Sequence, residues 1–402
     1  GDVYKRQGQF GVGQAGGVEP IVRLVEHAVA RPELGYTHLT KLDFSNAYNC
    51  VSRRVMAEAC RAHCSVLYRT ARWAYKQATP LVAMAQKRRA GAASGQVPAL
   101  AFQSSEGVRQ GDPLAPILFS LGMRGFLEAL QDRLGSEHLV MAYLDDVVIL
   151  SKMGSDSMEN STDTVSTAAE VARHAAPGLH LNVNKSSCAP LTDIRESGTE
   201  LLGTALGSAA FRWEFGMAKV ERIERVLPGL CELPKHLAWL ILSRCLAGRN
   251  AHLLRQLETA DLVTYGINPI WERQDRGLAW VVRHLRGSSI SLITDPILFA
   301  LPLRLGGLGL RGYSYVAPLA RQAMGTMTDH ELVRRGLVDG ELLGLGDFGT
   351  QSDEEQRDAM GRLPKQGMLV NDMYKRMADH LVLHAPDGVG RVLLEQSVPL
   401  GR

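Results

Sequence analysis

The sequence has no long apolar run. Its longest uninterrupted apolar stretches, such as the LAWLIL that begins at Leu237, are far shorter than the roughly 18 to 20 residues of a membrane-spanning helix. The first twenty residues also lack the apolar core of a secretory signal. We therefore predict no membrane association, and an intracellular protein of the nucleus or cytoplasm.

Cysteine is sparse, with six residues in 402 and no Cys-x-x-Cys pair. Only Cys60, His63 and Cys64 cluster, and a structural zinc site would need a second pair of ligands at matching spacing. We predict reduced thiols on a helix. A G-x-G-x-x-G pattern from Gly11 to Gly16 lacks the buried strand that a dinucleotide fingerprint requires, so we interpret it as a turn before a helix.

Acidic residues are scarce in one segment, although acidic and basic residues are nearly equal in number over the whole chain. The whole sequence is 45% hydrophobic and 22% charged with a net charge of +3, which excludes a disordered chain. Residues 50 to 90, however, contain nine basic residues and one acid, a net charge of +8, and Tyr68, Trp73 and Tyr75 add aromatic faces. This combination is typical of nucleic-acid binding, although a solvated helical face would look the same.

Three strand-like segments are predicted next to carboxylates. A strand over residues 36 to 42 is expected to end at Asp43, and strands over 138 to 143 and 147 to 151 flank the short segment Leu144, Asp145, Asp146, which predicts a hairpin. Adjacent carboxylates repel each other, so a divalent cation is the natural compensation, while each Asp alone could be an ordinary turn residue. Three carboxylates on adjacent antiparallel strands can hold two Mg²⁺ ions.

Helices are predicted on both sides of this hairpin. Ser52 is a cap for a helix from Arg53 towards His63, and Asp112 is the expected cap of a helix with Pro113 at its first position, ending near Leu134. Three further helices with apolar periodicity are expected downstream, over residues 217–233, 235–258 and 269–286.

Six motifs, in order, resemble those of reverse transcriptases of the non-LTR retrotransposon type. Motifs A, B and C are matched by LDFSNAYN (42–49), GVRQGDPLAPILFSL (107–121) and AYLDD (142–146). GLHLNVNKS (178–186) resembles motif D, and LLGTALG (201–207) resembles motif E. QFGVGQAGGVE (9–19) resembles the segment that precedes the palm.

The resemblance implies an α+β fold: a right-hand polymerase palm, an antiparallel sheet with packed helices, with partial fingers and a helical thumb-like C-terminal region. The implied divisions are a fingers or pre-palm remnant, the palm, the thumb-like region and a C-terminal helical extension, at residues 1–35, 36–215, 216–287 and 288–402. Almost no fingers sequence precedes the segment that begins at Gln9, so we expect an N-terminally truncated chain.

The resemblance also assigns residues. Asp43 and Asp145 would bridge two Mg²⁺ ions, for which Mn²⁺ can substitute, Asp146 would support them and the carbonyl of Phe44 would complete one metal shell. Tyr48 would act as a steric gate against the ribose 2′-hydroxyl and so favour deoxynucleotides.

Further roles follow from motifs B, D and E. Gln110 and Gly111 would lie under the incoming nucleotide, Arg109 would reach a phosphate or a neighbouring acid, and Lys185 is the candidate for protonating pyrophosphate. The residues expected to bind nucleic acid are Arg69, Arg72, Lys76, Lys87, Arg88, Arg89, Leu202 and Gly203.

The implied function is RNA-directed DNA synthesis by a retroelement. Its partners would be an RNA template, a DNA primer and deoxynucleoside triphosphates, with a ribonucleoprotein of the element's own transcript as one arrangement. Two alternatives stay open: a catalytically silent module that binds RNA or an RNA/DNA hybrid, and a group II intron or retron-type enzyme. The scarcity of fingers sequence also leaves open a chain that is inactive alone.

Overall fold

The chain folds into two compact units. The structure, a computed structural model, describes residues 8–13, 16–83, 100–152, 158–287, 295–343 and 365–384. Unit 1 comprises residues 1–21 and 31–192, and unit 2 comprises residues 22–30 and 193–402. Each unit has a buried apolar core of its own. The four finer divisions expected from the sequence stay predictions.

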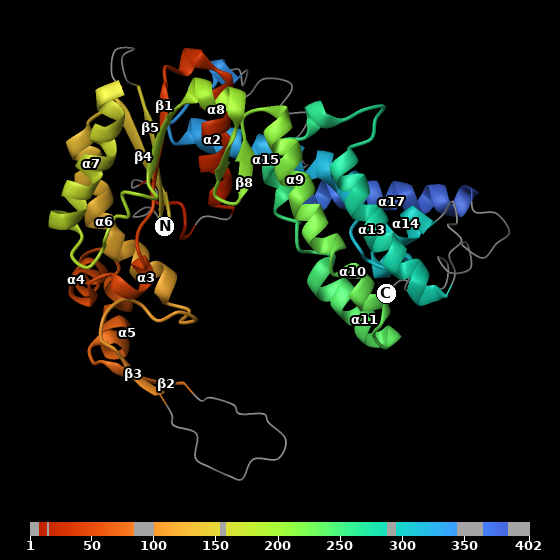
Figure 1. The fold of residues 1–402 in the computed structure, drawn as a ribbon, viewed down its shortest axis with the longest axis horizontal. Helices are drawn as coiled ribbons and strands as arrows, with labels where there is room; N and C mark the ends of the chain where they lie inside the picture. Colours follow the sequence, from red (N-terminus) through yellow and green to blue (C-terminus); the bar gives the residue numbers. More distant parts are fainter. Residues whose placement is uncertain are drawn as a thin grey trace, which may run out of the picture. The chain divides into compact units, whose positions relative to one another are not determined.

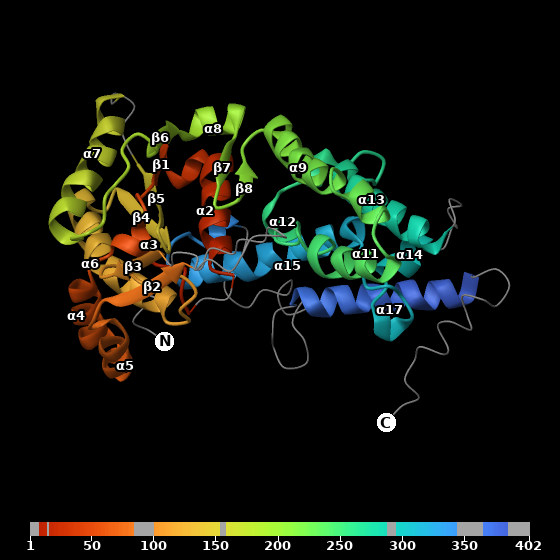
Figure 2. The ribbon, with the colours of Figure 1, turned by 60° about the horizontal axis from the view of Figure 1, so that its bottom comes forward.

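Unit 1 is built on a four-stranded sheet. Its strands are β1 (His38–Leu42), β4 (His138–Tyr143), β5 (Asp146–Ser151) and β6 (Ser187–Pro190). Their order is β4–β5–β1–β6, and each neighbouring pair is antiparallel (Figure 2). The predicted strand before Asp43 and the predicted hairpin are therefore both confirmed, and they lie next to each other in the sheet.

Two long helices cover one face of this sheet. They are α6 (Ala115–Leu134) and α7 (Met158–Ala175), which Figure 1 shows on the same side of β4 and β5. Phe119 and Phe126 of α6 are fully buried in the core, as are the apolar residues of β5. Every residue of β5 after Asp146 is buried, so both faces of this central strand are covered, which explains its apolar run.

The start of α6 differs from the prediction. Asp112 accepts a hydrogen bond from the backbone N–H of Leu114 through Oδ1 (2.9 Å), as a capping residue would. Its carbonyl also accepts from the N–H of Ala115 (3.0 Å), which closes a separate turn. The regular helix therefore begins at Ala115, two residues after Pro113, and it ends at Leu134 as expected.

The other elements of unit 1 lie between β1 and α6 or lead into the sheet. Ser52 caps α4 as predicted, because its Oγ accepts from the N–H of Val55 (3.5 Å). The bounds are α2 (Val18–Ala30, which continues into unit 2), η1 (Pro32–Leu34), α3 (Ala47–Cys50), α4 (Arg53–His63), α5 (Ser65–Tyr75), β2 (Thr79–Ala83) and β3 (Leu100–Ser104). Strands β2 and β3 pair with each other.

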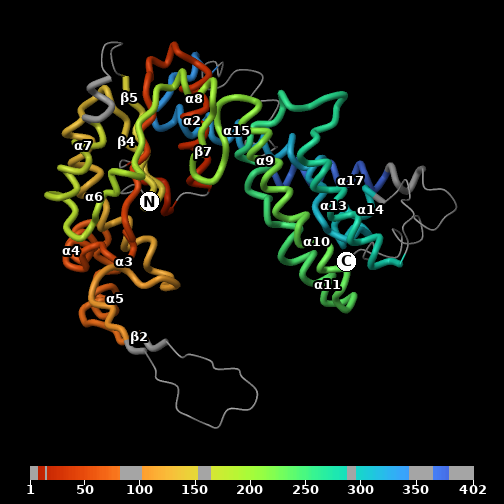
Figure 3. Tube along the Cα trace, in the orientation of Figure 1, coloured from red at the N-terminus to blue at the C-terminus, as the bar shows by residue number. Residues whose placement is uncertain are grey.

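In its described residues, unit 2 is helical apart from one short hairpin and an isolated bridge between Thr264 and Ile267. Helices α9 and α13 run side by side in it (Figure 3). Its elements are α8 (Leu191–Ser197), β7 (Thr199–Leu201), β8 (Thr204–Leu206), α9 (Ala209–Glu224), α10 (Leu227–Cys231), α11 (Lys235–Ile241), a π-helical turn η2 (Leu242–Leu246), α12 (Leu253–Gln256), η3 (Ala260–Leu262), α13 (Pro269–Arg286), α14 (Asp295–Ala300), η4 (Leu303–Leu305), α15 (Tyr313–Arg334), η5 (Glu341–Leu343) and α17 (Gln366–His384).

Helix boundaries in unit 2 match the sequence only in part. The helix predicted from 269 to 286 is confirmed, with Asn268 capping it. The segment 217–233 is instead divided between α9 and α10, because Pro228 cannot donate the backbone hydrogen bond that would continue α9. The segment 235–258 is interrupted by the π-helical turn and irregular backbone. None of the helices in the described ranges is long and apolar enough to cross a membrane.

Candidate active site

The three predicted acids meet at one end of the sheet. Asp43 follows the last residue of β1. Asp145 lies in the two-residue turn between β4 and β5, in which Leu144 has a φ of 58°, and Asp146 is the first residue of β5. In the antiparallel register Leu42 is opposite Val147, so Asp43 and Asp146 are next to each other on adjacent strands. The sheet therefore brings together residues that are about 100 positions apart in the sequence.

The acids also interact electrostatically. The pKa of Asp146 is raised, first by burial of part of its carboxylate and then by the negative charges of Asp145 and Asp43. Repulsion of this kind makes a cation favourable, and carboxylate oxygens are ligands that Mg²⁺ prefers. The donor set fits a divalent ion in its chemistry, although no three His, Cys, Asp or Glu side chains in the described part of the chain are already arranged to hold a metal.

A cavity of about 530 Å³ is lined by one of these acids, Asp145. Ten residues line it, and they come from motifs A, B and C. They are Phe44, Asn46, Ala47, Tyr48, Gln110, Gly111, Asp112, Ala115, Pro116 and Asp145. Four predicted nucleotide-binding residues, Phe44, Tyr48, Gln110 and Gly111, thus share one cavity with a predicted metal ligand.

Tyr48 has a defined orientation in this wall. Its ring stacks on that of Phe119, with centroids 4.4 Å apart and planes 14° from parallel. Burial, and then the negative charge of Asp145 and the neighbouring Tyr143, raise the pKa of Tyr48 to about 12. The phenol therefore stays neutral at physiological pH, held by packing next to Asp145.

The motif B loop needs glycine at two positions. Gly107 has a φ of 62°, and a Cβ there would lie 2.2 Å from the carbonyl carbon of Asn49. Gly111 has a φ of 87° with open space around it, so its requirement is conformational only. This backbone presents Gln110 and Gly111 to the cavity.

Arg109 is directed away from the cavity that we expect to bind the nucleotide. Its guanidinium donates to the carbonyl of Ala74 (2.5 Å) and lies over the ring of Tyr75, 4.6 Å from the centroid. It also contributes to the lowered pKa of Asp112, in which hydrogen bonds from Tyr75 and Leu114 and the charge of Arg109 outweigh the opposing effect of burial. Of the two predicted partners for Arg109, the neighbouring acid is therefore the one beside it in the structure.

Lys185 is exposed on a turn attached to the backbone of motif A. The N–H of Asn182 donates to the carbonyl of Asp43 (2.7 Å), and the N–H of Asp43 donates to Ser186 Oγ (3.1 Å). Phe44 and Leu181 also form a β-bridge. The motif D turn that carries Lys185 is thus fixed beside the first acid, with the lysine side chain in solvent.

The basic segment divides into exposed and buried parts. Arg69, Arg72 and Lys76 are exposed around α5, and Trp73 between them is 85% exposed. Tyr75 is only 4% exposed, so the expectation that its ring is available to bases is wrong. The predicted residues Lys87, Arg88 and Arg89 lie outside the described residues.

The remaining predicted nucleic-acid contacts, Leu202 and Gly203, are in unit 2. They form the tip of the β7–β8 hairpin, with φ values of 47° and 82°. Positive φ at both central residues is typical of the tight turn that suits the twist of a two-residue hairpin.

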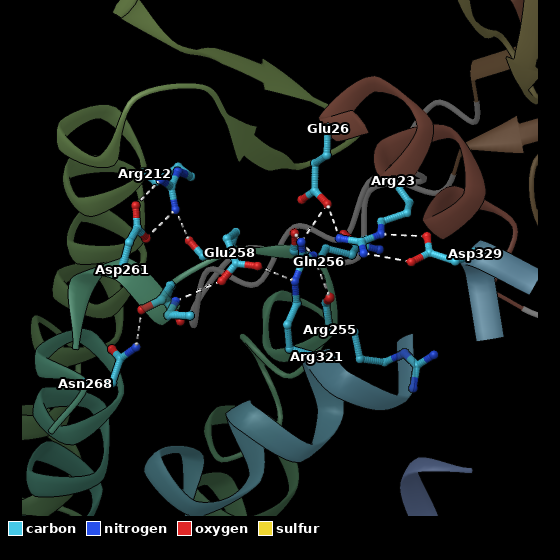
Figure 4. Close-up of polar contacts among 12 residues, drawn as sticks. Arg23, Glu26, Arg212, Arg255, Gln256, Glu258, Asp261, Asn268, Arg321 and Asp329 are labelled. Atoms are coloured by element: carbon cyan, nitrogen blue, oxygen red, sulfur yellow. Dashed lines mark hydrogen bonds and ion pairs between the residues drawn. The ribbon is translucent and has the colours of Figure 1, made fainter. Parts of the chain in front are cut away.

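A larger cavity, of about 810 Å³, lies wholly within unit 2. Several of its charged residues form ion pairs or hydrogen bonds with other residues of the unit. Arg321 pairs with Glu258 (3.0 Å) and Glu26 (2.6 Å), as Figure 4 shows. Asp275 accepts from the N–H groups of Tyr313 and Ser314 at the start of α15. The smaller cavity is therefore the candidate active site, because its wall carries the motif residues.

Comparison with known proteins agrees with the motifs. The family model for reverse transcriptase (RNA-dependent DNA polymerase) matches residues 9–206. Over 339 residues, 79% of this chain, the sequence is 27% identical to the retrotransposable element SLACS 132 kDa protein of Trypanosoma brucei gambiense. Residues 9–206 are a reverse transcriptase domain of the non-LTR type.

The chain spans about a quarter of the length of that relative. Among solved structures it resembles telomerase from Candida albicans in complex with a fragment of telomeric RNA, with a TM-score of 0.40, 11% identity and coverage of 88% of this chain and 53% of that one. It also resembles an apo telomerase from Candida tropicalis truncated from its C-terminal domain, with a TM-score of 0.36, 13% identity and coverage of 50% and 40%.

Sequence reasoning missed the residues that support the reverse transcriptase motifs. Tyr75 was identified only as an aromatic in a basic segment, and Asp112 only as a helix cap, yet their side chains are hydrogen-bonded to each other (2.6 Å). In the sequence, Arg53 is one of the nine basic residues of segment 50 to 90, whereas in the structure it donates to the carbonyl of Gly107 (2.9 Å). The sequence has no local signal for these contacts, because the partners are 37 and 54 residues apart.

Proposed function

We propose that this chain catalyses RNA-directed DNA synthesis, the transfer of a nucleotide from a deoxynucleoside triphosphate to the 3′-hydroxyl of a primer. The observation that carries the proposal is the 530 Å³ cavity, whose wall combines Phe44, Tyr48, Gln110, Gly111 and Asp145. An RNA template, a DNA primer and the incoming deoxynucleotide are the partners that this site would take.

Positioning and charge neutralisation are the main catalytic contributions in such a reaction. The ring of Tyr48, held against Phe119, limits the space beside the nucleotide sugar and so selects against a 2′-hydroxyl. Gln110 and Gly111 support the nucleotide from the motif B loop. Lys185, on the turn beside Asp43, supplies a cation that can approach the pyrophosphate.

Asp43, Asp145 and Asp146 are the residues that would hold two Mg²⁺ ions, or Mn²⁺ in their place, with the carbonyl of Phe44 as a further oxygen donor. Bound there, the ions would lower the pKa of the primer hydroxyl and neutralise the leaving phosphates. The raised pKa of Asp146 supports this assignment, because the negative charges of Asp145 and Asp43 add to the effect of its burial.

Nucleic acid would contact unit 1 through the exposed face of α5, where Arg69, Arg72 and Lys76 surround Trp73. Guanidinium and ammonium groups neutralise phosphates, and an exposed indole stacks on unpaired bases. In unit 2, Leu202 and Gly203 at the β7–β8 turn would contact the primer. We expect the protein to act in the nucleus or cytoplasm, in a ribonucleoprotein with its own transcript.

The proposal is tested by primer extension on poly(rA)/oligo(dT) with Mg²⁺ or Mn²⁺. We expect incorporation of dTMP that falls at least about 10³-fold in Asp145→Asn, because the variant keeps the side-chain shape and loses the charge. Asp379→Asn, an exposed acid on α17, is the matched control and should leave incorporation unchanged. Binding of the hybrid without incorporation by the parent chain would instead favour the catalytically silent binding module.

A further inference from the structure

Tyr75, the last residue of α5, joins two segments of unit 1. Its hydroxyl donates to Asp112 Oδ2 (2.6 Å) and accepts from the backbone N–H of Arg109 (3.2 Å). The side chain is almost completely buried. Both partners belong to the motif B loop, so one phenol holds this loop at two points, three residues apart.

Two guanidinium groups lie over the ring of Tyr75. Arg109 Cζ lies 4.6 Å and Arg53 Cζ 5.3 Å from its centroid. Cations over the face of a phenol are attracted by its negative π-surface. The ring therefore helps to fix two arginines, which bind different parts of the backbone. Arg109 donates to the carbonyl of Ala74 in α5, and Arg53 donates to the carbonyl of Gly107 in the motif B loop.

Arg53 extends this support to the beginning of the motif B loop. Its guanidinium donates to Ser104 Oγ (2.9 Å), to the carbonyl of Glu106 (3.1 Å) and to that of Gly107 (2.9 Å). Tyr75 and Arg53 together thus hold the loop from residue 104 to residue 112.

The held loop is the part of motif B that forms the cavity wall. Gln110, Gly111 and Asp112 line the 530 Å³ cavity, whereas Tyr75 does not. One carboxylate oxygen of Asp112 accepts from Leu114 N–H at the approach to α6, and the other accepts from Tyr75. Without the phenol hydroxyl, Oδ2 loses its donor and Gly111 loses the constraint on one side of its left-handed backbone.

We infer that Tyr75 is a positioning residue for the nucleotide cavity: through Asp112 and the N–H of Arg109 it sets the backbone that presents Gln110 and Gly111. The inference rests on the proposed function, because it takes the cavity as the site of the incoming nucleotide. Tyr75 itself does not touch that nucleotide. Its contribution is to the geometry of the loop before the substrate arrives.

The decisive variant is Tyr75→Phe, which removes one oxygen and keeps the ring that contacts both arginines. We expect the KM for dTTP in primer extension to rise about tenfold, as for a lost hydrogen bond to a charged group, with a change in kcat below about threefold. Tyr36→Phe is the matched control, because Tyr36 is a half-buried phenol in the same unit, just before β1 and at the end of that strand opposite Asp43. Its KM should stay unchanged.

Two further measurements separate positioning from general stability. In the Asp112→Ala background, Tyr75→Phe should raise KM by less than about twofold, since its partner is already gone. Hydrogen exchange of the segment 108–114 should accelerate in Tyr75→Phe and not in Tyr36→Phe, and this readout needs no catalysis.

The outcomes distinguish the two proposals. A parent chain that neither extends a primer nor binds dTTP overturns the proposed function, while faster exchange in Tyr75→Phe would still support the loop contact. An active parent chain with an unchanged KM in Tyr75→Phe, or unchanged exchange in segment 108–114, overturns the positioning role. A lower melting temperature with unchanged KM would make Tyr75 a purely structural residue.

Discussion

The proposed role of Tyr48 in this reverse transcriptase domain depends on a packing contact that its motif does not contain. Tyr48 comes five positions after Asp43 in the sequence, and in the structure it lines the same cavity as Asp145. Its face is packed on Phe119 from α6, an element more than 60 residues away. The proposed selectivity of the site thus depends on an aromatic pair, because an unsupported phenol could rotate and give room to a 2′-hydroxyl.

Replacing Tyr48 tests this selectivity. Tyr48→Val should increase the use of ribonucleotides relative to deoxynucleotides by at least about tenfold, because the space beside the sugar is no longer filled. The measurement is the ratio of kcat/KM for UTP and dTTP on the same primer–template. Tyr48→Phe keeps the ring and serves as control, with an expected ratio near that of the parent chain. Equal ratios in the Val variant and the parent would remove the gate assignment.

At the scale of elements, ion pairs connect helix α2 to α15 within unit 2. Arg23 and His27 of α2 both bind the carboxylate of Asp329, at 2.8 Å each (Figure 4 shows the contact with Arg23). The Asp329 side chain is only 14% exposed. Burial alone would raise its pKa, but the hydrogen bonds and charges of Arg23 and His27 lower it to about 2.

Stability should depend on pH through this carboxylate. The folded-state pKa of Asp329 lies below the value of an unfolded chain, so its contribution of about 2 kcal/mol is present above pH 4 and is lost as the pH falls towards 2. Urea unfolding should therefore find Asp329→Asn less stable than the parent at pH 5, with the gap closing near pH 2. Asp379→Asn should show no such gap, and a pH-independent difference for Asp329→Asn would refute the linkage.

At the scale of the whole molecule, charge is distributed unevenly. The chain carries +3 in total, whereas residues 50 to 90 carry +8. Within that segment Arg53 serves the fold, whereas Arg69 and Arg72 stay in solvent on α5. Among the described residues of this segment, exposed cations such as these can neutralise phosphates, whereas Arg53 is bound to backbone carbonyls and does not add to the charge that nucleic acid meets.

The salt dependence of binding tests this exposed group. The triple variant Arg69→Gln, Arg72→Gln, Lys76→Gln should reduce the slope of log affinity against log salt by about 2 to 3 for an RNA/DNA hybrid, roughly one for each lost phosphate contact. Fluorescence anisotropy over a salt series measures the slope. Arg334→Gln is the control, because Arg334 is already neutralised by Glu331 (2.7 Å). An unaltered slope in the triple variant would make α5 an ordinary solvated helix.

The sequence by itself determined the family and the local elements of the site. Motif spacing placed Asp43 after a strand and Asp145 and Asp146 at a hairpin, because strand alternation and turn chemistry are local properties. The position of a nucleotide cavity between motifs A, B and C was also implied by the resemblance.

Only the tertiary structure decided which charged and aromatic side chains face the site and which support it. Tyr75 and Arg53 belong to a basic, aromatic segment whose composition is that of a nucleic-acid surface, yet both are bound to the motif B loop. The same composition leaves Trp73 exposed. Burial, packing and hydrogen bonds across 30 to 55 positions make this difference, and no pattern within a short window contains them.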